Sequence, residues 1–223
     1  MVRPGRWGLD AGLRARRDAM ADGEPANEAE SKRRMILRVA RRHFMAEGFA
    51  GTGMEAVARD AGISTATLYT HFPGKRDLFS WVLDDAADEF SRRLAPVREL
   101  TGPARRRITD FAVAYARFMS DPCVRAVYRL VAAERRWFGR AADTFHQRGR
   151  LELAAALTEA LTELTADGQL RVEQPAWAAG QLMGLIEHPA FLAPLVGGDA
   201  ALTRTPEAIA EDAVETFMAR FGA

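Results

Sequence analysis

The sequence predicts an all-α fold in which a three-helix head precedes a larger helical body. Apolar residues recur at steps of three and four along most of the chain after residue 28, which is the spacing of one face of a helix. Strict alternation of apolar and polar residues, the mark of a strand, is not found, and β-branched clusters are few. With 48% hydrophobic and 27% charged residues in 223, the composition is that of an ordinary globular protein.

The head is predicted as one longer helix and two short ones. Helical spacing runs over residues 28–48 and again over 54–61, where Gly62 ends it. A glycine reaches positive φ without strain, so this position suits a sharp turn. Ser64 then offers an N-cap hydroxyl to a helix through about residue 70. Two short helices joined by a glycine turn and packed on a longer one form a helix-turn-helix.

The body is predicted to begin after the break at Pro73-Gly74, with a long helix over 75–94 that links it to the head. Asp121-Pro122 is typical of a cap followed by a proline at the first helical position. The other helices are expected at 103–119, 122–138, 142–166, 175–196 and 205–221.

The first 27 residues contain five arginines and several glycines with little apolar periodicity, which predicts a flexible basic arm. Met20 within this arm is a possible natural start. Through residue 80 there are 14 Lys and Arg against 10 Asp and Glu, whereas the remainder has 17 against 20. A basic front on an acidic body permits nucleic-acid contact at the head but does not establish it.

Residues 36–79 resemble the DNA-binding domain of the TetR/AcrR family of transcription regulators. The joint order and spacing of the matching residues make this resemblance specific. They are Phe44, Glu47-Gly48-Phe49, Thr52, Val57-Ala58, Ala61-Gly62-Ile63-Ser64, Thr67-Leu68-Tyr69, His71-Phe72, Lys75 and Leu78-Phe79.

The resemblance implies a set of DNA contacts. Small side chains at the start of the third helix would let a duplex approach closely, and Thr65 and Ala66 match positions that approach bases in the major groove. The positions commonly in contact with phosphates are Thr52, Thr67, Tyr69, His71 and Lys75, and the predicted DNA-binding set also includes Gly53 and Ser64. Leu68 and Phe72 are expected in the core. Tyr69 can serve packing or phosphate contact, and His71 can cap local backbone instead.

Two departures from the family pattern bear on these contacts. Lysine is frequent where Thr65 stands, which leaves the operator sequence open. Serine or threonine is frequent where Gly53 stands, so a weaker helix cap and one fewer phosphate contact are expected.

The body resembles the C-terminal domains of AefR-like members over residues 104–195, through Arg129–Glu134, Trp137-Phe138 and Phe145. An apolar effector cavity between helices is expected from the concentration of aromatic residues, with ordinary core packing as the alternative. The ligand-binding candidates are Phe111, Tyr115, Phe118, Tyr128, Glu134, Trp137, Phe138, His146, Trp177 and Gln181. In relatives the last two helices form a dimer interface; here their small residues also allow purely intramolecular packing.

The resemblance therefore implies a homodimeric, ligand-responsive regulator, a repressor released from a palindromic operator by a small hydrophobic effector, although activation stays open. The expected division is an arm over 1–27, a DNA-binding domain over 28–74, and an effector-binding and dimerisation domain over 75–223. No cofactor or metal is expected. A cytoplasmic location is predicted, because the sequence contains neither a signal core nor an apolar run long enough to cross a bilayer.

Two other classes of function, an enzyme and a protein-binding adaptor, are alternatives to a DNA-binding regulator. An enzyme would need a set of catalytic residues brought together from different helices. The sequence lacks a G-x-S-x-G elbow, a glycine-rich phosphate-binding loop and paired histidines with the spacing of metal ligands. Cys123 is the single cysteine, which excludes an intramolecular disulfide and a multi-cysteine metal site. A helical adaptor that binds a protein through the same head would differ from a DNA binder in its weaker response to salt.

Overall fold

The computed structural model describes residues 24–98 and 100–223, so the predicted arm lies almost wholly outside the described residues, Met20 included. The described residues form helices with short connections, and their one strand-like pairing is an isolated bridge between Leu170 and Gly222. The predicted all-α fold is confirmed. In the part of the chain described, no helix is both long enough and apolar enough to span a membrane.

The head consists of α2 (Glu24–Gly51), α3 (Met54–Asp60) and α4 (Thr65–His71). In α2 the backbone leaves helical geometry at Gly48, where φ is 69°, and a short final turn follows. Gly62, between α3 and α4, has a φ of 66°, which a residue with a Cβ rarely adopts. Both glycines therefore mark changes of direction, as the sequence predicts.

The body contains α5 (Lys75–Leu94), α6 (Ala104–Met119), α7 (Pro122–Glu134), α8 (Gly139–His146), α9 (Glu152–Ala166), α10 (Pro175–Glu187), α11 (Ala193–Gly197) and α12 (Pro206–Phe221), with short 3-10 turns η1 (Ala95–Arg98) and η4 (Asp199–Ala201). The helix predicted to reach residue 138 ends at Glu134. The amides of Trp137 and Phe138 both donate to the Glu134 carbonyl at 3.0 Å, which closes a turn there.

Two helices predicted as continuous are interrupted by π-helical turns. The segment over 142–166 is divided by η2 (Gln147–Leu151), and the segment over 175–196 by η3 (His188–Leu192). Pro189 lies in η3 and lacks an amide hydrogen, so the regular helical ladder cannot continue through it. Such turns are rare and occur often at functional sites.

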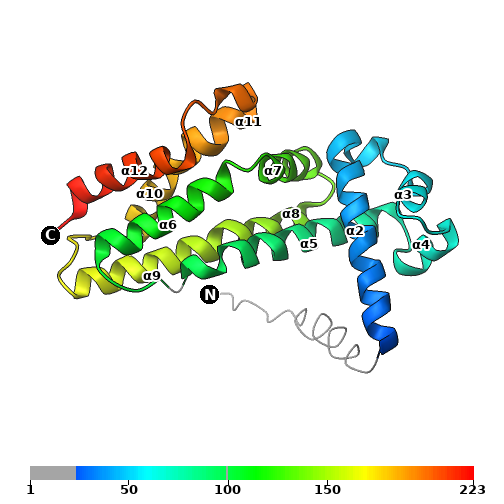
Figure 1. The fold of residues 1–223 in the computed structure, drawn as a ribbon, viewed down its shortest axis with the longest axis horizontal. Helices are drawn as coiled ribbons and strands as arrows, with labels where there is room; N and C mark the ends of the chain where they lie inside the picture. Colours follow the sequence, from blue (N-terminus) through cyan, green and yellow to red (C-terminus); the bar gives the residue numbers. More distant parts are fainter. Residues whose placement is uncertain (1–23, 99) are drawn as a thin grey trace, which may run out of the picture.

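The head lies at one end of an elongated molecule and the C-terminus at the other, with α2 crossing the direction of α5 (Figure 1). Buried residues form two clusters. One, the head cluster, contains buried residues of α2, α3 and α4 together with Leu78, Phe79, Val82 and Leu83 of α5. The other, the body cluster, contains Ala86, Ala87, Phe90 and Leu94 of α5 together with buried residues of the helices that follow. Since α5 contributes to both, a displacement of this helix would affect both cores.

Candidate nucleic-acid interface and effector site

The turn between α3 and α4 fixes the orientation of α4. The Ile63 amide donates to the carbonyl of Ala58 at 3.0 Å, across the positive-φ Gly62. The Ser64 hydroxyl caps α4 by accepting from the Thr67 amide at 3.0 Å. Leu68 is fully buried and anchors α4 to the head cluster. One side of the short helix is thereby held in the core, and the other side faces outward.

The outward side of α4 presents small polar and aromatic groups. Ser64, Thr65 and Ala66 are exposed at its first turn, and Tyr69 is 44% exposed. Thr67 is half-buried, with its hydroxyl 2.8 Å from that of Ser64, and His71 is half-buried at the helix end. The structure therefore brings these six predicted DNA-binding residues together on α4 and its N-cap, with the first three exposed.

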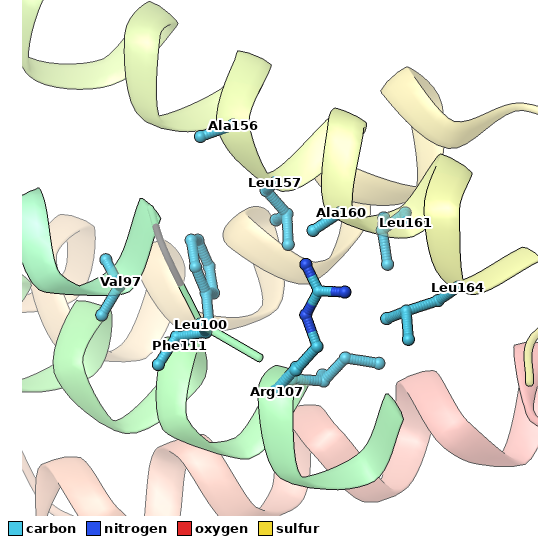
Figure 2. Close-up of a pocket in the computed structure, with 10 residues that line it drawn as sticks. Val97, Leu100, Arg107, Phe111, Ala156, Leu157, Ala160, Leu161 and Leu164 are labelled. Atoms are coloured by element: carbon cyan, nitrogen blue, oxygen red, sulfur yellow. The ribbon is translucent and has the colours of Figure 1, made fainter. Parts of the chain in front are cut away.

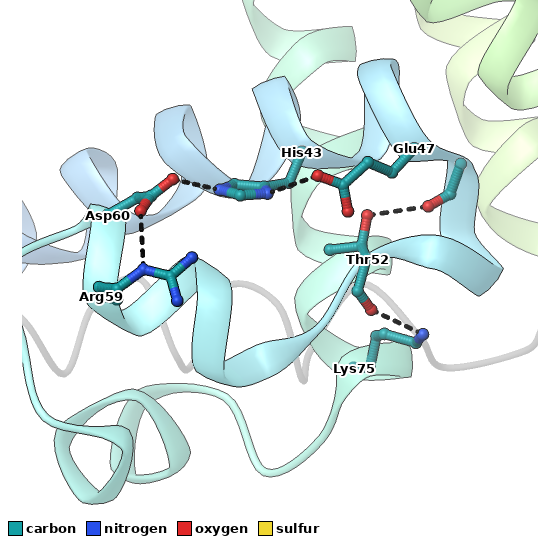
Figure 3. Close-up of polar contacts among 7 residues, drawn as sticks. His43, Glu47, Thr52, Arg59, Asp60 and Lys75 are labelled. Atoms are coloured by element: carbon teal, nitrogen blue, oxygen red, sulfur yellow. Dashed lines mark hydrogen bonds and ion pairs between the residues drawn. The ribbon is translucent and has the colours of Figure 1, made fainter.

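Thr52 and Lys75 have structural contacts that the sequence does not predict (Figure 3). Thr52 is 2% exposed, and its hydroxyl donates to the Gly48 carbonyl at 2.8 Å. The Lys75 ammonium donates to the carbonyls of Ala50 and Thr52 at 3.1 and 2.8 Å, which leaves one of its three hydrogens. Because the Thr52 side chain is buried and its hydroxyl is bonded within the protein, Thr52 is not available for the predicted phosphate contact. Gly53 precedes α3, which begins without a side-chain cap.

His43 joins α2 to α3 through a polar contact that sequence reasoning missed. Its Nε2 lies 2.9 Å from Asp60 Oδ2, and its Nδ1 lies 3.3 Å from Glu47 Oε1 (Figure 3). The hydrogen bond from His43, with a smaller contribution from Arg59, lowers the pKa of Asp60. Only a tertiary structure reveals this contact, because residues 43 and 60 lie on different helices.

Aromatic side chains from several elements meet in the body around Phe90 of α5. The Phe90 ring centroid lies 4.9 Å from that of Phe118 and 5.3 Å from that of Phe145. Tyr128 continues the set at 5.0 Å from Phe145 and 4.8 Å from Phe191. We call Phe90, Phe118, Tyr128, Phe145 and Phe191 the aromatic cluster. Its members come from α5, α6, α7, α8 and η3, so it joins most of the body.

A polar group of Tyr115, Arg150 and Glu187 lies beside this cluster. The Tyr115 hydroxyl donates to Glu187 Oε1 at 2.5 Å, and Arg150 Nε donates to the same oxygen at 3.0 Å. Burial, reinforced by the negative charge of Glu187, raises the pKa of Tyr128 to about 12. The same two causes raise the pKa of Tyr115 well above its usual value. Arg150 belongs to η2 and Glu187 immediately precedes η3, so this polar group connects the two π-helical turns.

The structure separates the predicted effector-site residues into groups. Phe111, Tyr115, Phe118 and Tyr128 lie in or beside the aromatic cluster. Phe138 instead packs into the head cluster, 4.8 Å from Phe49 and 4.4 Å from Phe79. Five other candidates do not join the aromatic cluster. Trp137, Trp177 and His146 are exposed, the two tryptophans by 62% and 65%. Glu134 is half-buried at the end of α7, and Gln181 lines a groove beside α12.

Comparison with known families identifies both parts of the chain. Residues 36–81 match the bacterial regulatory proteins of the tetR family, and residues 106–223 match the AefR-like transcriptional repressor, C-terminal domain. The second match alone covers more than half of the 223 residues. Among the described residues, no group of three or more His, Cys, Asp and Glu is placed to hold a metal ion.

Individual relatives are similar over different extents. The HTH-type transcriptional regulator AcrR of Shigella flexneri is 39% identical over 61 residues, which are 26% of this chain and 28% of that protein. The Flavonoid-responsive Regulator FrrA is 28% identical, with a TM-score of 0.68 over 86% of this chain and 98% of that one. A TetR-family regulator from Mesorhizobium loti MAFF303099 shares the fold at 24% identity, with a TM-score of 0.74 over 87% and 98% of the two chains.

Proposed function

Because the chain belongs to the TetR family of DNA-binding transcriptional regulators, with an AefR-like C-terminal domain, we propose that it is a homodimeric repressor released from its operator by a small hydrophobic effector. The observation that carries the proposal is the exposed first turn of α4, on a helix-turn-helix at the end of the molecule. The family is one of regulators and not of enzymes.

For DNA contact we propose the outward side of α4. Thr65 and Ala66 meet base edges or thymine methyls in the major groove, and Ser64, Thr67, Tyr69 and His71 reach phosphates. Lys75 contributes its positive charge, and its third ammonium hydrogen can be donated to a phosphate. The exposure of Thr65, Ala66 and Tyr69 supports this assignment, since a base-reading side chain must be free in the unbound protein.

For the effector we propose the interior beside the aromatic cluster, with Phe111, Tyr115, Phe118 and Tyr128 as contacts. Apolar rings with a few convergent polar groups are typical of small-molecule sites. The similarity to FrrA, described as flavonoid-responsive, supports a small and largely apolar effector for this chain too. The match to an AefR-like repressor domain supports repression as the sign of regulation.

For the homodimer we propose the exposed side of α10, η3 and α11 together with α12. Trp177, Leu185, Leu192 and Val196 are exposed by 41% or more and recur at helical spacing along this side. Gln181 lies among them, and its Oε1 is buried without a hydrogen-bond partner among the described residues. A second copy would cover the apolar stripe and can supply a donor to that oxygen.

The proposed mechanism uses α5 and Phe138 as the link between body and head. Phe90 of α5 lies in the aromatic cluster, and Phe79 of the same helix contacts Phe138. An effector that binds more tightly when α5 is displaced would favour that state of the protein. In that state the two DNA-binding heads of the dimer would no longer be spaced to fit the two halves of a palindromic operator. Only such a difference in effector affinity between the two states can shift the equilibrium.

The test is fluorescence anisotropy on labelled DNA from upstream of the gene, with a shuffled duplex beside it, across a salt series. We expect preferential binding to the upstream DNA that weakens steeply with salt, because phosphate contacts release counterions. Ala66→Glu should weaken binding at least tenfold, since a carboxylate would face the duplex. Ala155→Glu, at an exposed position of α9, is the matched control and should leave binding unchanged.

Each alternative has its own outcome in this experiment. No binding at low salt would contradict DNA recognition and favour the adaptor. A panel of flavonoids and alkyl carboxylates added to the complex should contain compounds that reduce operator affinity. A compound that binds and increases that affinity would instead identify an effector-dependent activator or corepressed protein, and the proposed sign of regulation would be wrong.

A further inference from the structure

His43 connects α2 to the C-terminal end of α3 (Figure 3). Its side chain is 13% exposed, and its Nε2 lies 2.9 Å from Oδ2 of Asp60, the last residue of α3. The lowered pKa of Asp60 keeps this carboxyl group ionised at neutral pH. Because an ionised carboxylate only accepts hydrogen bonds, the imidazole nitrogen is the donor. The contact is therefore a charge-assisted hydrogen bond between two helices.

A second contact restricts the rotation of the His43 ring. Its Nδ1 lies 3.3 Å from Oε1 of Glu47, one turn further along α2. The ring thus has a carboxylate at each nitrogen, one from its own helix and one from α3 (Figure 3). With Nδ1 held by Glu47, Nε2 stays directed at Asp60.

An acid at the position of Asp60 is not favoured by α3 itself. A carboxylate at the C-terminal end of a helix lies near the partial negative charge of the helix dipole, which is unfavourable. Arg59 contacts Oδ1 of Asp60 at 3.4 Å, but the two residues are neighbours in the sequence and are both exposed. The contact that gives Asp60 a role in the tertiary structure is therefore the one with His43.

The place of Asp60 in the head gives this contact its consequence. The residues that follow it, Ala61 and Gly62, form the turn to α4, and the Ile63 amide donates back to the Ala58 carbonyl of α3. Because hydrogen bonds close this turn, the direction of α4 follows that of the end of α3. The side chain of His43 thus holds α3 at the point from which the recognition helix departs.

The contact also differs in kind from the apolar packing around it. Burial of apolar side chains is a non-directional force, whereas a hydrogen bond depends on both distance and angle. On its other side α2 is joined to α5 of the body, where Arg41 donates to Glu89. We propose that His43 is a positioning residue of the head, which fixes the end of α3 and hence the direction of α4 relative to α2 and α5. This inference rests on the proposed function for its effect on operator binding.

The test compares the affinities for upstream and shuffled DNA by fluorescence anisotropy, with folding checked by circular dichroism. His43→Leu should lower the ratio of the two affinities at least about threefold, because a misdirected α4 loses base contacts and a partly exposed ionic contact contributes a factor of a few. Affinity for shuffled DNA and its dependence on salt should stay the same, since phosphate contacts supply them. His43→Gln keeps a donor for Asp60 and should restore the ratio, which a role in packing alone would not predict.

The body supplies a matched control in Arg107 of α6, whose guanidinium extends toward Leu157 and Ala160 of α9 (Figure 2). Its side chain is 16% exposed, and its two terminal nitrogens donate to one oxygen of Glu163 at 3.2 and 3.1 Å. The cavity that it lines measures about 20 Å³, room for about one water molecule, so this ion pair serves to join two helices. Arg107→Met breaks an equally buried contact outside the head and should leave both affinities unchanged.

Asp60→Ala breaks the same contact from an exposed position and keeps the test decisive if His43→Leu fails to fold. It should lower the affinity ratio by a similar factor, and the double variant should lower it no further. An unchanged ratio in both single variants, or an equal loss of affinity for the two duplexes, would overturn the positioning role.

Urea unfolding without DNA tests the contact separately from the proposed function. Asp60→Ala should lower the urea midpoint of the wild type but raise that of His43→Leu, in which the carboxylate is left with the unfavourable helix dipole. The same shift in both backgrounds would show that the contact is absent and overturn the inference while leaving DNA recognition intact. A wild type that binds neither duplex would contradict the proposed function, and the positioning role with it, whatever the urea midpoints show.

Discussion

Tyr128 illustrates how tertiary packing changes the chemistry of a single residue. Its ring contacts Phe145 and Phe191, and Glu187 lies close enough for its negative charge to act on the phenol. Burial and this charge both disfavour the phenolate and raise the pKa of Tyr128 to about 12. The neutral hydroxyl is therefore the form that stabilises the folded body.

The pH dependence of stability follows from this shift. In the unfolded chain a tyrosine has a pKa near 10, which is lower than the pKa of Tyr128 in the folded protein. The stability that the neutral Tyr128 hydroxyl contributes is therefore fully present below pH 10. It is lost as the pH rises from about 10 to about 12. Absorbance at 295 nm should show an ionisation near pH 12 that Tyr128→Phe removes. Glu187→Gln should move it to lower pH, and an unmoved transition would contradict the proximity of the two groups.

The cap of α4 also acts through one residue. The Ser64 hydroxyl accepts from the Thr67 amide, and loss of such a cap costs about 1 kcal/mol of stability. Ser64→Ala should lower the free energy of unfolding by about that amount in urea denaturation followed by circular dichroism. Thr65→Ala, one residue further along and exposed, is expected within about 0.5 kcal/mol of wild type. Equal effects of the two substitutions would argue against the cap.

At the scale of elements, the junction between head and body depends on the turn after α7. Phe138 in this turn is 7% exposed and packs between Phe49 of α2 and Phe79 of α5. Arg76 adds a cation–π contact, with its guanidinium carbon 5.8 Å from the ring centroid. A residue of the C-terminal body thus completes the core of the head, so the turn between α7 and α8 directly contacts α2 and α5.

Truncation of Phe138 should separate the two parts energetically. Phe138→Ala should lower the free energy of unfolding by about 3 kcal/mol or more, as buried phenylalanine truncations do. Trp137→Ala is the control, because Trp137, the neighbouring residue, is 62% exposed and should contribute less than about 0.5 kcal/mol. In anisotropy, Phe138→Leu should keep operator binding but weaken the response to effector. A full response in Phe138→Leu would mean that α5 alone carries the signal.

In the whole molecule, α10 and α11 lie away from the head (Figure 1), and they carry most of the apolar stripe of Trp177, Leu185, Leu192 and Val196. Two copies joined through it would carry their heads at a separation set by the body helices. The symmetry of such a pair matches a palindromic operator. Loss of the pair would therefore reduce operator affinity without a change in α4.

A charge within the stripe should produce a monomer. Leu185→Asp is expected to halve the mass measured by light scattering after size exclusion, because a buried unpaired carboxylate is strongly unfavourable at an interface. Leu151→Asp is matched in exposure, at 39% against 41%, and lies outside the stripe. It should remain a dimer. If Leu185→Asp also stayed dimeric, the interface would have to lie on another face.

Features that depend on local spacing follow from the amino-acid sequence alone. Apolar periodicity predicted the helices, Gly62 predicted the turn of the helix-turn-helix, and the order of residues over 36–79 indicated the family. These signals are local, because helix faces, caps and positive-φ turns each involve residues within a few positions of one another. The bounds of α5, α6 and α12 accordingly agree with the prediction to within a residue.

Contacts between side chains far apart in the sequence become visible when the helices are packed together in the tertiary structure. It placed Phe138 in the head, committed Lys75 to the carbonyls of Ala50 and Thr52, and divided two predicted helices at η2 and η3. It also placed the Arg107 guanidinium among the leucines of α9. Burial and hydrogen bonding between helices depend on how those helices pack, and packing is a property of the whole chain that no local pattern records.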